Sequence, residues 1–185
     1  MKYTRMKIAD AYVVELEPHG DNRGFFSRVF CKNEFVTQGM DDRVVQINNS
    51  FNQYKGTLRG LHYQLPPSQE TKLVRVVRGS LWDVIVDMRQ DSPTFMQWDA
   101  VTLTAEKRNM IFVPRGCAHG IITLEDNTEM LYFVSEFYDP ANERGAKWDD
   151  PKFSIDWPIE PVIISEKDKK NPYFDPDYHL WSEDK

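Results

Sequence analysis

The 185-residue sequence is poor in several kinds of feature, and each scarcity excludes a class of protein. It has only two cysteines, Cys31 and Cys117, so a disulfide-stabilised secreted fold is disfavoured and reduced thiols are expected. No segment approaches the ~18 uncharged apolar residues that a membrane helix needs. Residues 1–20 alternate charged and apolar side chains and lack the apolar centre of a signal peptide. We therefore expect a cytoplasmic protein.

Positive charge is also scarce. Lys and Arg total 23 against 29 Asp and Glu, which gives a formal net charge of −6. Binding to nucleic acid or to an anionic membrane surface generally needs an excess of basic residues, so we expect neither partner. Apolar residues make up 41% of the chain and aromatic residues 13%, which is enough for a folded core.

The apolar residues recur mostly with a period of two, in short runs bounded by Gly, Pro, Asn or Asp, which indicates strands. The predicted strands are Ala11–Leu16, Phe25–Phe30, Val44–Asn52, Thr57–Gln64, Lys72–Arg78, Leu81–Arg89, Thr94–Leu103, Met110–Pro114, Gly120–Leu124 and Met130–Tyr138. Gly79 lies between two of them and predicts a tight hairpin. Short helices are expected over Cys31–Met40 and near Lys167–Lys170. Many short strands with few helices predict an all-β sandwich or barrel.

No linker-like change of composition divides residues 1–185, so a single domain is predicted. Residues from about 140 to 185 form a proline-rich tail that also carries large apolar side chains. These are Trp148, Phe153, Ile155, Trp157 and Trp181. Side chains of this size are not expected to remain in water, so the tail should pack on the barrel or on a second subunit. A homodimer is favoured on symmetry grounds.

Two of the four histidines lie in segments suited to chemistry. His62 belongs to the strand Gly56–Gln64, where strict alternation places Arg59 on the other face. A bulge at Gly60 would bring Arg59 to the same cavity. Burying both side chains is costly without partners, so a polar cavity is predicted.

His119 lies in Pro114–Gly120, a Pro-x-Gly-x-x-His pattern that resembles the second motif of the cupin superfamily. A metal-binding cupin also has two histidines one residue apart in its first motif, whereas this chain has only His62 there. A metal site made by His62, His119 and Glu70 is therefore the less favoured alternative. A metal-free cupin-type double-stranded β-helix barrel is the better interpretation.

Lys72 and Tyr132 each begin or lie within an apolar run. Taken singly, they are explained as a strand-end ammonium and a core aromatic residue. Together with His62 they provide an imidazole, an ammonium and a phenol. These groups suit proton abstraction next to a carbonyl, in which a base removes the proton, a cation stabilises the enolate and an acid returns a proton.

Several segments occur in an order and at spacings that are highly specific together. They are Asp21–Phe26, Gln46–Ser50, Gly56–Gln64, Lys72–Arg75, Asp83–Arg89, Asp91–Phe95, Pro114–Gly120, Glu143–Gly145 and Trp148–Pro151. In this arrangement the sequence resembles the dTDP-4-dehydrorhamnose 3,5-epimerases and related sugar-nucleotide epimerases. The resemblance implies a metal-free cupin barrel, a homodimer, no cofactor and a nucleotide-diphosphate 4-keto-6-deoxy sugar as substrate.

The resemblance also implies roles for individual residues. His62 would be the base, Asp168 its carboxylate partner, Lys72 the enolate-stabilising cation and Tyr132 the acid on the opposite face. Further residues would bind the substrate and its nucleotide: Arg23, Phe26, Arg28, Gln46, Asn48, Arg59, His119, Tyr138 and Glu143. The chain departs from many rhamnose-pathway members at Ser27-Arg28, where they have a glutamate, and this puts the choice of nucleotide base in question.

Two other functions remain as alternatives. A 3,4-ketoisomerase on the same substrate class would use a similar barrel but has less use for an acid on the opposite face. A metal-binding or non-catalytic cupin would have no use for the acid–base set of His62, Lys72 and Tyr132. The sequence also lacks the Gly-x-Gly-x-x-Gly pattern of dinucleotide-binding proteins. Proton abstraction next to an existing ketone needs no nicotinamide.

Overall fold

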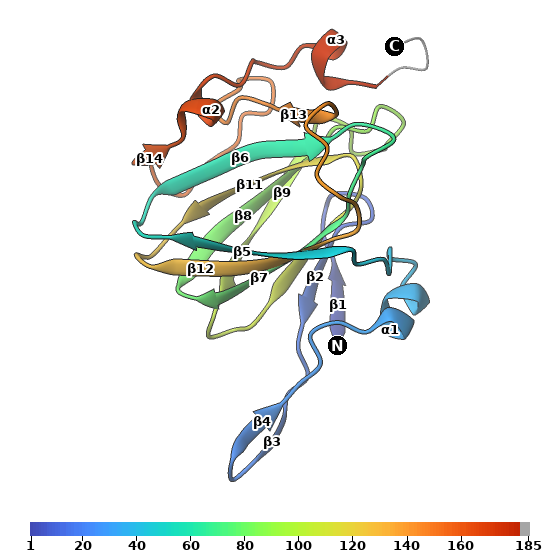
Figure 1. The fold of residues 1–185 in the computed structure, drawn as a ribbon, viewed down its shortest axis with the longest axis vertical. Coiled ribbons are helices and arrows are strands. Elements are labelled where there is room, and N and C mark those ends of the chain that lie inside the picture. Colours follow the sequence, from blue (N-terminus) through green and yellow to red (C-terminus); the bar gives the residue numbers. More distant parts are fainter. Residues whose placement is uncertain (182–185) are drawn as a thin grey trace.

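The computed structural model describes residues 1–181, and within them two antiparallel sheets face each other across a common interior (Figure 1). The first sheet has the order β1-β2-β10-β7-β12-β5, and the second has β13-β6-β11-β8-β9, with β14 pairing in parallel beside β6. The strands of the first sheet are β1 (Lys2–Arg5), β2 (Tyr12–Glu15), β5 (Gln46–Asn52), β7 (Lys72–Arg78), β10 (Met110–Val113) and β12 (Thr128–Val134). The strands of the second are β6 (Thr57–Gln64), β8 (Ser80–Asp87), β9 (Trp98–Thr104), β11 (Cys117–Thr123), β13 (Glu143–Gly145) and β14 (Ile163–Ile164). The predicted all-β, cupin-type barrel is confirmed.

The remaining elements lie outside these sheets. They are the hairpin of β3 (His19–Asp21) and β4 (Gly24–Phe26) and the helices α1 (Lys32–Thr37), α2 (Glu166–Lys169) and α3 (Pro176–His179). The hairpin projects well away from the barrel, at the opposite side from the C-terminal tail (Figure 1). None of the helices in residues 1–181 is long and apolar enough to cross a membrane. Both cysteines are free thiols, and Cys117 is buried.

The strands with clear alternation agree best with the prediction. Strands β6 and β7 begin and end at the predicted residues. The strand predicted over Phe25–Phe30 is shortened to β4, which pairs only with β3. The strands that were not predicted are only two to four residues long, and β1 and β13 are mostly polar, so they carry no apolar alternation from which to recognise them.

The prediction of a hairpin around Gly79 is wrong. Strand β7 pairs with β10 and β12 in the first sheet, while β8 pairs with β11 and β9 in the second. Gly79 therefore forms a corner at which the chain crosses between the sheets. Both edges of β7 are taken by strands distant in sequence, so it does not pair with β8, the next strand along the chain.

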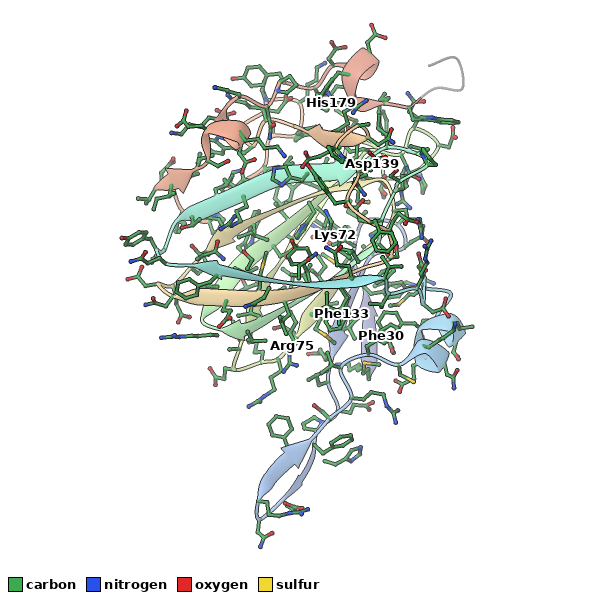
Figure 2. The ribbon with its side chains drawn as sticks, in the orientation of Figure 1. Phe30, Lys72, Arg75, Phe133, Asp139 and His179 are labelled. Carbon is green, nitrogen blue, oxygen red and sulfur yellow. The ribbon has the colours of Figure 1, made fainter. Side chains whose placement is uncertain are left out.

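The interior between the sheets is apolar toward one end. Its core includes Val74 and Val76 of β7 and Leu81 and Ile85 of β8, all buried, and Tyr132 packs against this cluster. Lys72 is the first residue of β7 and lies between the two sheets, whereas Phe133 points to the outer side of the first sheet (Figure 2). The polar side chains are therefore concentrated at the other end of the interior.

Part of the outer face of each sheet is covered. Phe35 of α1 is buried over the first sheet, with its ring edge-on to those of Phe30 and Phe112. The C-terminal tail covers the second sheet, where buried Phe153 and half-buried Trp157 pack against the same cluster as β8 and β11 residues. This packing holds the tail against the barrel.

We expect Phe153→Ala to lower the free energy of unfolding by about 3–5 kcal/mol, since it removes a buried ring and leaves a cavity. Phe153 is 4% exposed and packs edge-on against Phe174 of the tail. Urea unfolding followed by tryptophan fluorescence measures the change. Tyr54→Ala is the control because Tyr54 is 51% exposed, and it should shift stability by no more than ~0.5 kcal/mol. Equal effects of the two substitutions would contradict the packing role of Phe153.

Candidate active site

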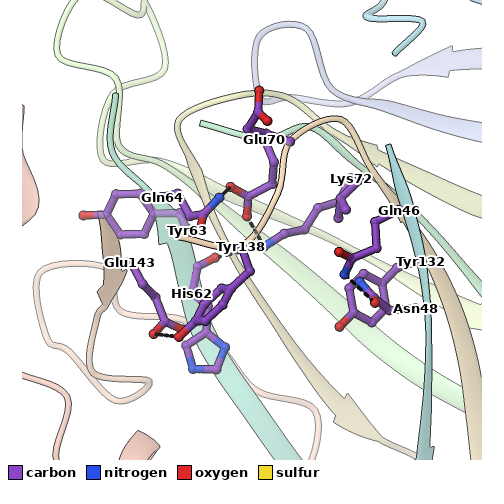
Figure 3. Close-up of a pocket in the computed structure, with 12 residues that line it drawn as sticks. Gln46, Asn48, His62, Tyr63, Gln64, Glu70, Lys72, Tyr132, Tyr138 and Glu143 are labelled. Atoms are coloured by element: carbon purple, nitrogen blue, oxygen red, sulfur yellow. Dashed lines mark hydrogen bonds and ion pairs between the residues drawn. The ribbon is translucent and has the colours of Figure 1, made fainter. Parts of the chain in front are cut away.

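Two adjoining cavities of about 400 and 300 Å³ open between the sheets at the polar end of the interior. His62, Lys72 and Tyr132 line both of them (Figure 3). The first cavity also includes Gln46, Asn48, Glu70, Tyr138 and Glu143, and the second includes Arg59, His119, Lys167 and Asp168. All four residues proposed to act in catalysis therefore border one continuous region.

Strand alternation explains why these side chains converge. Lys72 on β7 and Tyr132 on β12 face inward from the first sheet, whereas His62 on β6 and His119 on β11 belong to the second. His62 and His119 are direct cross-strand partners, and cross-strand neighbours lie side by side on a sheet. The imidazole of His62 and the phenol of Tyr132 consequently enter the space from facing sheets.

A bulge in β6 brings Arg59 to the same space, as the sequence predicted. Arg59 pairs with Ile121 and His62 pairs with His119, so Gly60 and Leu61 together face Gly120 alone. Gly60 has φ +120°, and a Cβ there would lie 2.7 Å from the Gly120 Cα. Only glycine fits this close approach. Arg59 is oriented by a 2.7 Å hydrogen bond from its Nε to Asn52 Oδ1.

The imidazole of His62 is held by Asp168, which follows it by 106 residues. The distance from His62 Nε2 to Asp168 Oδ1 is 2.6 Å. A carboxylate accepts hydrogen bonds, so Nε2 carries the proton and Nδ1 is left as the acceptor. Burial raises the pKa of Asp168, but the hydrogen bond from His62 and its charge outweigh this, so the net pKa is lowered. Asp168 therefore stays ionised beside the ring.

Asp168 is itself positioned by the start of α2. The Ser165 hydroxyl caps this helix by accepting a 3.1 Å hydrogen bond from the Asp168 N–H. The second carboxylate oxygen lies 3.4 Å from the Gly60 N–H at the bulge. The same bulge thus contacts the carboxylate and sets the register of His62.

His119 forms a second imidazole–carboxylate pair, with Asp83 of β8. Its Nε2 lies 3.0 and 2.9 Å from the two carboxylate oxygens. Asp83 is fully buried, and burial raises its pKa although the charge and hydrogen bond of His119 oppose the change. The two pairs therefore differ in direction: the pKa of the carboxyl beside His62 is lowered, and that of the carboxyl beside His119 is raised.

The ammonium of Lys72 is fixed within the interior. Its Nζ lies 3.0 Å from Glu70 Oε1 and 3.4 Å from the backbone oxygen of His62. The Lys72 side chain is only 13% exposed, so its charge acts in a region with little water. In such surroundings an ammonium interacts with a nearby oxyanion more strongly than in bulk solvent.

Glu143 is the centre of a cluster at the mouth of the cavities. Lys167 Nζ lies 2.7 and 2.6 Å from its two carboxylate oxygens, and the Tyr138 hydroxyl donates to it at 2.9 Å. The pKa of Glu143 is lowered, because these hydrogen bonds outweigh the opposing effect of burial. The hydrogen bond to Glu143 raises the pKa of Tyr138. On β5, Gln46 Nε2 donates to Asn48 Oδ1 at 2.7 Å.

Three predicted binding residues lie outside these cavities. Arg23 is highly exposed on the β3–β4 turn and pairs with Asp21. Phe26 and Arg28 line a separate hollow near the N-terminus, and Arg28 pairs with Glu34 at 2.7 Å. The physical reason is that the hairpin projects from the barrel and does not fold over its own interior (Figure 1).

Sequence reasoning missed Lys167 and Asp83 as site residues and considered Glu70 only as a metal ligand. Asp83 had a signal, since it is a charged residue within the apolar run of β8. Lys167 had none, because its place depends on how the tail folds back. Glu70, His62 and His119 each contact a different charged partner. Within residues 1–181, no group of three His, Cys, Asp or Glu side chains is arranged to hold a metal ion.

Comparison with known proteins gives consistent matches over nearly the whole chain. Residues 5–176 match the family model described as dTDP-4-dehydrorhamnose 3,5-epimerase. A Shigella flexneri protein of that name is 41% identical over 182 residues, which cover 97% of this chain and 100% of the relative. The crystal structure of the Elizabethkingia anophelis enzyme of that name has a TM-score of 0.93 at 36% identity, covering 97% of this chain and 99% of the other.

A Legionella pneumophila dTDP-6-deoxy-D-glucose-3,5-epimerase, solved in complex with dTDP-4-keto-L-rhamnose, has a TM-score of 0.87 at 37% identity. The match covers 93% of this chain and 92% of that one.

The lowered pKa of Asp168 makes stability depend on pH. A carboxyl group whose folded-state pKa is depressed stabilises the fold above its ordinary pKa, near 4, and loses this contribution as pH falls below it. Wild type should therefore be more stable than Asp168→Asn at pH 7, with a smaller difference at about pH 3.5. Urea midpoints at the two pH values measure this. A difference that does not shrink in acid would contradict the prediction.

Proposed function

Because the chain belongs to the dTDP-4-dehydrorhamnose 3,5-epimerase family and is a sugar-nucleotide epimerase, we propose how its two cavities carry out the reaction. The proposed substrate is a dTDP-linked 4-keto-6-deoxyhexose, in which the carbons on both sides of the ketone are inverted. The relative solved with dTDP-4-keto-L-rhamnose supports this substrate class. The observation that carries the proposal is that His62 and Tyr132 enter one shared region from facing sheets.

His62 is the proposed base, and its partner distinguishes it from His119. When a base takes a proton from C3 or C5, its ring becomes an imidazolium. An ionised carboxylate stabilises that cation, and the lowered pKa of Asp168 provides one at neutral pH. Asp83 has a raised pKa, so it is the poorer partner for a histidine that becomes charged. His62 Nδ1 accepts the proton, while Nε2 remains bonded to Asp168.

Lys72 is the proposed stabiliser of the enolate. As the C–H bond breaks, its electron pair forms the new carbon–carbon double bond and the C4 oxygen becomes negative. An ammonium placed at that oxygen lowers the activation free energy of the reaction by about 3 kcal/mol. The Lys72 ammonium is within the interior and little exposed, which supports this role.

Tyr132 is the proposed acid. Its hydroxyl gives a proton to the same carbon from the face opposite His62, the double bond returns to C=O, and the carbon is inverted. The solvent then restores both side chains to their starting protonation states. A base and an acid on facing sheets suit inversion better than a 3,4-ketoisomerisation, in which a proton moves between neighbouring carbons.

The diphosphate is proposed to bind on the side of Arg59. The second cavity contains the cationic groups Arg59 and Lys167, together with His119. Arg59 uses Nε for its bond to Asn52, which leaves its two terminal nitrogens for phosphate oxygens. A chain with net charge −6 can bind an anionic substrate in this way because the charge at the site, and not the total, is what the substrate meets.

A homodimer is proposed to complete the site. Phe25 and Phe26 on the projecting hairpin are 48% and 71% exposed. The outer face of the first sheet also exposes Ile47 (55%) and Phe51 (50%) on β5. Exposed apolar groups on a projecting arm and on a sheet face fit a two-fold interface. In such a dimer the hairpin of one copy supplies Arg23 and Phe26 to the cavities of the other.

We expect His62→Ala to lower kcat by about 10²–10⁴-fold, the usual contribution of a general base. Tyr132→Phe should still exchange substrate protons with heavy water, because His62 remains, but should invert the carbons slowly. Mass spectrometry and NMR of the sugar measure exchange and inversion separately. Tyr54→Phe is the phenol control. Normal exchange by His62→Ala would exclude His62 as the base.

The number of carbons inverted has its own measurement. With a dTDP-4-keto-6-deoxyhexose in heavy water, the wild-type enzyme should give a product carrying a deuteron at C3 and another at C5. A deuteron at only one of these carbons would replace the proposed double inversion by a single one.

Substrates linked to cytidine, guanosine or uridine diphosphate test the nucleotide preference. Any of them that reacts as fast as the dTDP sugar argues against the proposed preference for dTDP.

The proposed contribution of one subunit's hairpin to the cavities of its partner can be tested by mixing two inactive variants. In a mixed dimer of Arg23→Ala and His62→Ala, one cavity has His62 and receives an intact hairpin. Random association should therefore restore about a quarter of wild-type activity. Mixing His62→Ala with Tyr132→Phe is the control, since both changes inactivate the chain's own cavity and no recovery is expected. No recovery in the first mixture, with mixed dimers present, would contradict the proposed exchange.

A further inference from the structure

Glu70 is a carboxylate in the cavity wall to which the proposed reaction assigns no role. It lies on the connection between β6 and β7, two residues before Lys72. Its side chain is only 9% exposed, so water does little to stabilise its charge. A carboxylate in this position needs partners, and its two oxygens have different ones.

One oxygen of Glu70 contacts the proposed enolate-stabilising residue. Oε1 lies 3.0 Å from Lys72 Nζ, and Oε2 accepts a 2.8 Å hydrogen bond from Gln64 Nε2 (Figure 3). Glu70 therefore joins Lys72 to the end of β6. The carboxylate uses both oxygens as acceptors, one for the ammonium and one for the amide.

Gln64 is a fixed anchor for this contact. It is 5% exposed, and its Nε2 also lies 2.7 Å from the Ser68 oxygen and 3.2 Å from the Phe137 oxygen. Its Oε1 accepts from the Asp139 N–H at 2.5 Å. The amide is thus bonded to backbone groups on two separate connections. Glu70 takes its position from this rigid group and not from solvent.

We propose that Glu70 is a positioning residue that aims the Lys72 ammonium at the carbonyl oxygen of the substrate. Nζ has three hydrogens. One is directed to Glu70, and a second to the His62 backbone oxygen at 3.4 Å, which leaves the third for the enolate oxygen. A lysine side chain without such a contact samples many rotamers, of which few place Nζ at the reacting atoms. This inference rests on the proposed role of Lys72.

The chemistry of the contact explains why a carboxylate is suited to it. Lys72 and Gln64 donate to different oxygens of Glu70, and in a glutamine one of these two positions is an NH2 group that cannot accept, so the side chain can serve only one of the two donors in this geometry. Glu70→Gln should therefore retain part of the positioning, while Glu70→Ala should lose it entirely. Comparing the two variants separates loss of one hydrogen bond to Lys72 or Gln64 from loss of the whole Glu70 side chain.

The test measures kcat and KM for the sugar nucleotide and the Kd of dTDP for a set of variants. Glu70→Ala should lower kcat roughly ten- to a hundredfold, with KM and the Kd of dTDP changed less than about twofold, because only the reacting centre is displaced. Glu70→Gln should lie between Glu70→Ala and wild type. Glu15→Gln is the matched control, since Glu15 forms a comparable 3.1 Å pair with Lys2 far from the cavities.

A double-variant cycle distinguishes positioning from a structural role. In the Lys72→Met background, Glu70→Ala should cause little further loss of kcat, because the group that it aims is gone. An equal loss in both backgrounds, or a wild-type kcat for Glu70→Ala, would overturn the inference while leaving the proposed role of Lys72 intact. A wild-type kcat for Lys72→Met would overturn that role and the inference with it. Thermal unfolding of each variant shows whether the fold is retained.

Discussion

The interior of this barrel depends on pairing each titratable group that is removed from water. A buried polar or ionised group is costly unless hydrogen bonds or an opposite charge compensate it, and removal of one partner leaves the other uncompensated. Three such pairs occupy one end of the space between the sheets: His62 with Asp168, His119 with Asp83, and Lys72 with Glu70. The apolar residues at the other end supply the packing, so this end is free to hold reactive groups.

The residues of the site lie partly on strands and partly on the C-terminal tail, and this difference decides how much of the site was predictable. Lys72, Tyr132 and His62 lie on strands with clear alternation, so their convergence follows from the strand pattern once the sheets face each other. The bulge at Gly60 was predictable because glycine within a strand favours one. Asp168 came only from family resemblance, since nothing local to a tail helix indicates a contact with a residue 106 positions earlier.

The wrong pairing predicted at Gly79 has a physical origin. The turn at Gly79 suited a hairpin locally, but which sheet a strand joins is decided by partners far away in the chain, and these separate β7 from β8. The direction of the β3–β4 hairpin was equally unpredictable, since it extends from the barrel and keeps Arg23 and Phe26 away from the cavities of their own chain. Local pattern predicts a strand and its inward face. It does not predict the direction in which a connecting arm leaves the fold.

The approach of β6 to β11 at Gly60 and Gly120 has a consequence for how this enzyme can diversify. A Cβ on Gly60 would meet Gly120 Cα at 2.7 Å, and a Cβ on Gly120 would meet Leu61 Cδ2 at the same distance. In a saturation library, position 60 should therefore admit almost no replacement, because its neighbours are backbone atoms, whereas a side chain at position 120 would require Leu61 to move. Exposed rim residues such as Tyr138 face no comparable barrier. New sugar or nucleotide preferences are thus expected to arise by substitutions around the rim, while the β6–β11 contact beneath it remains unchanged.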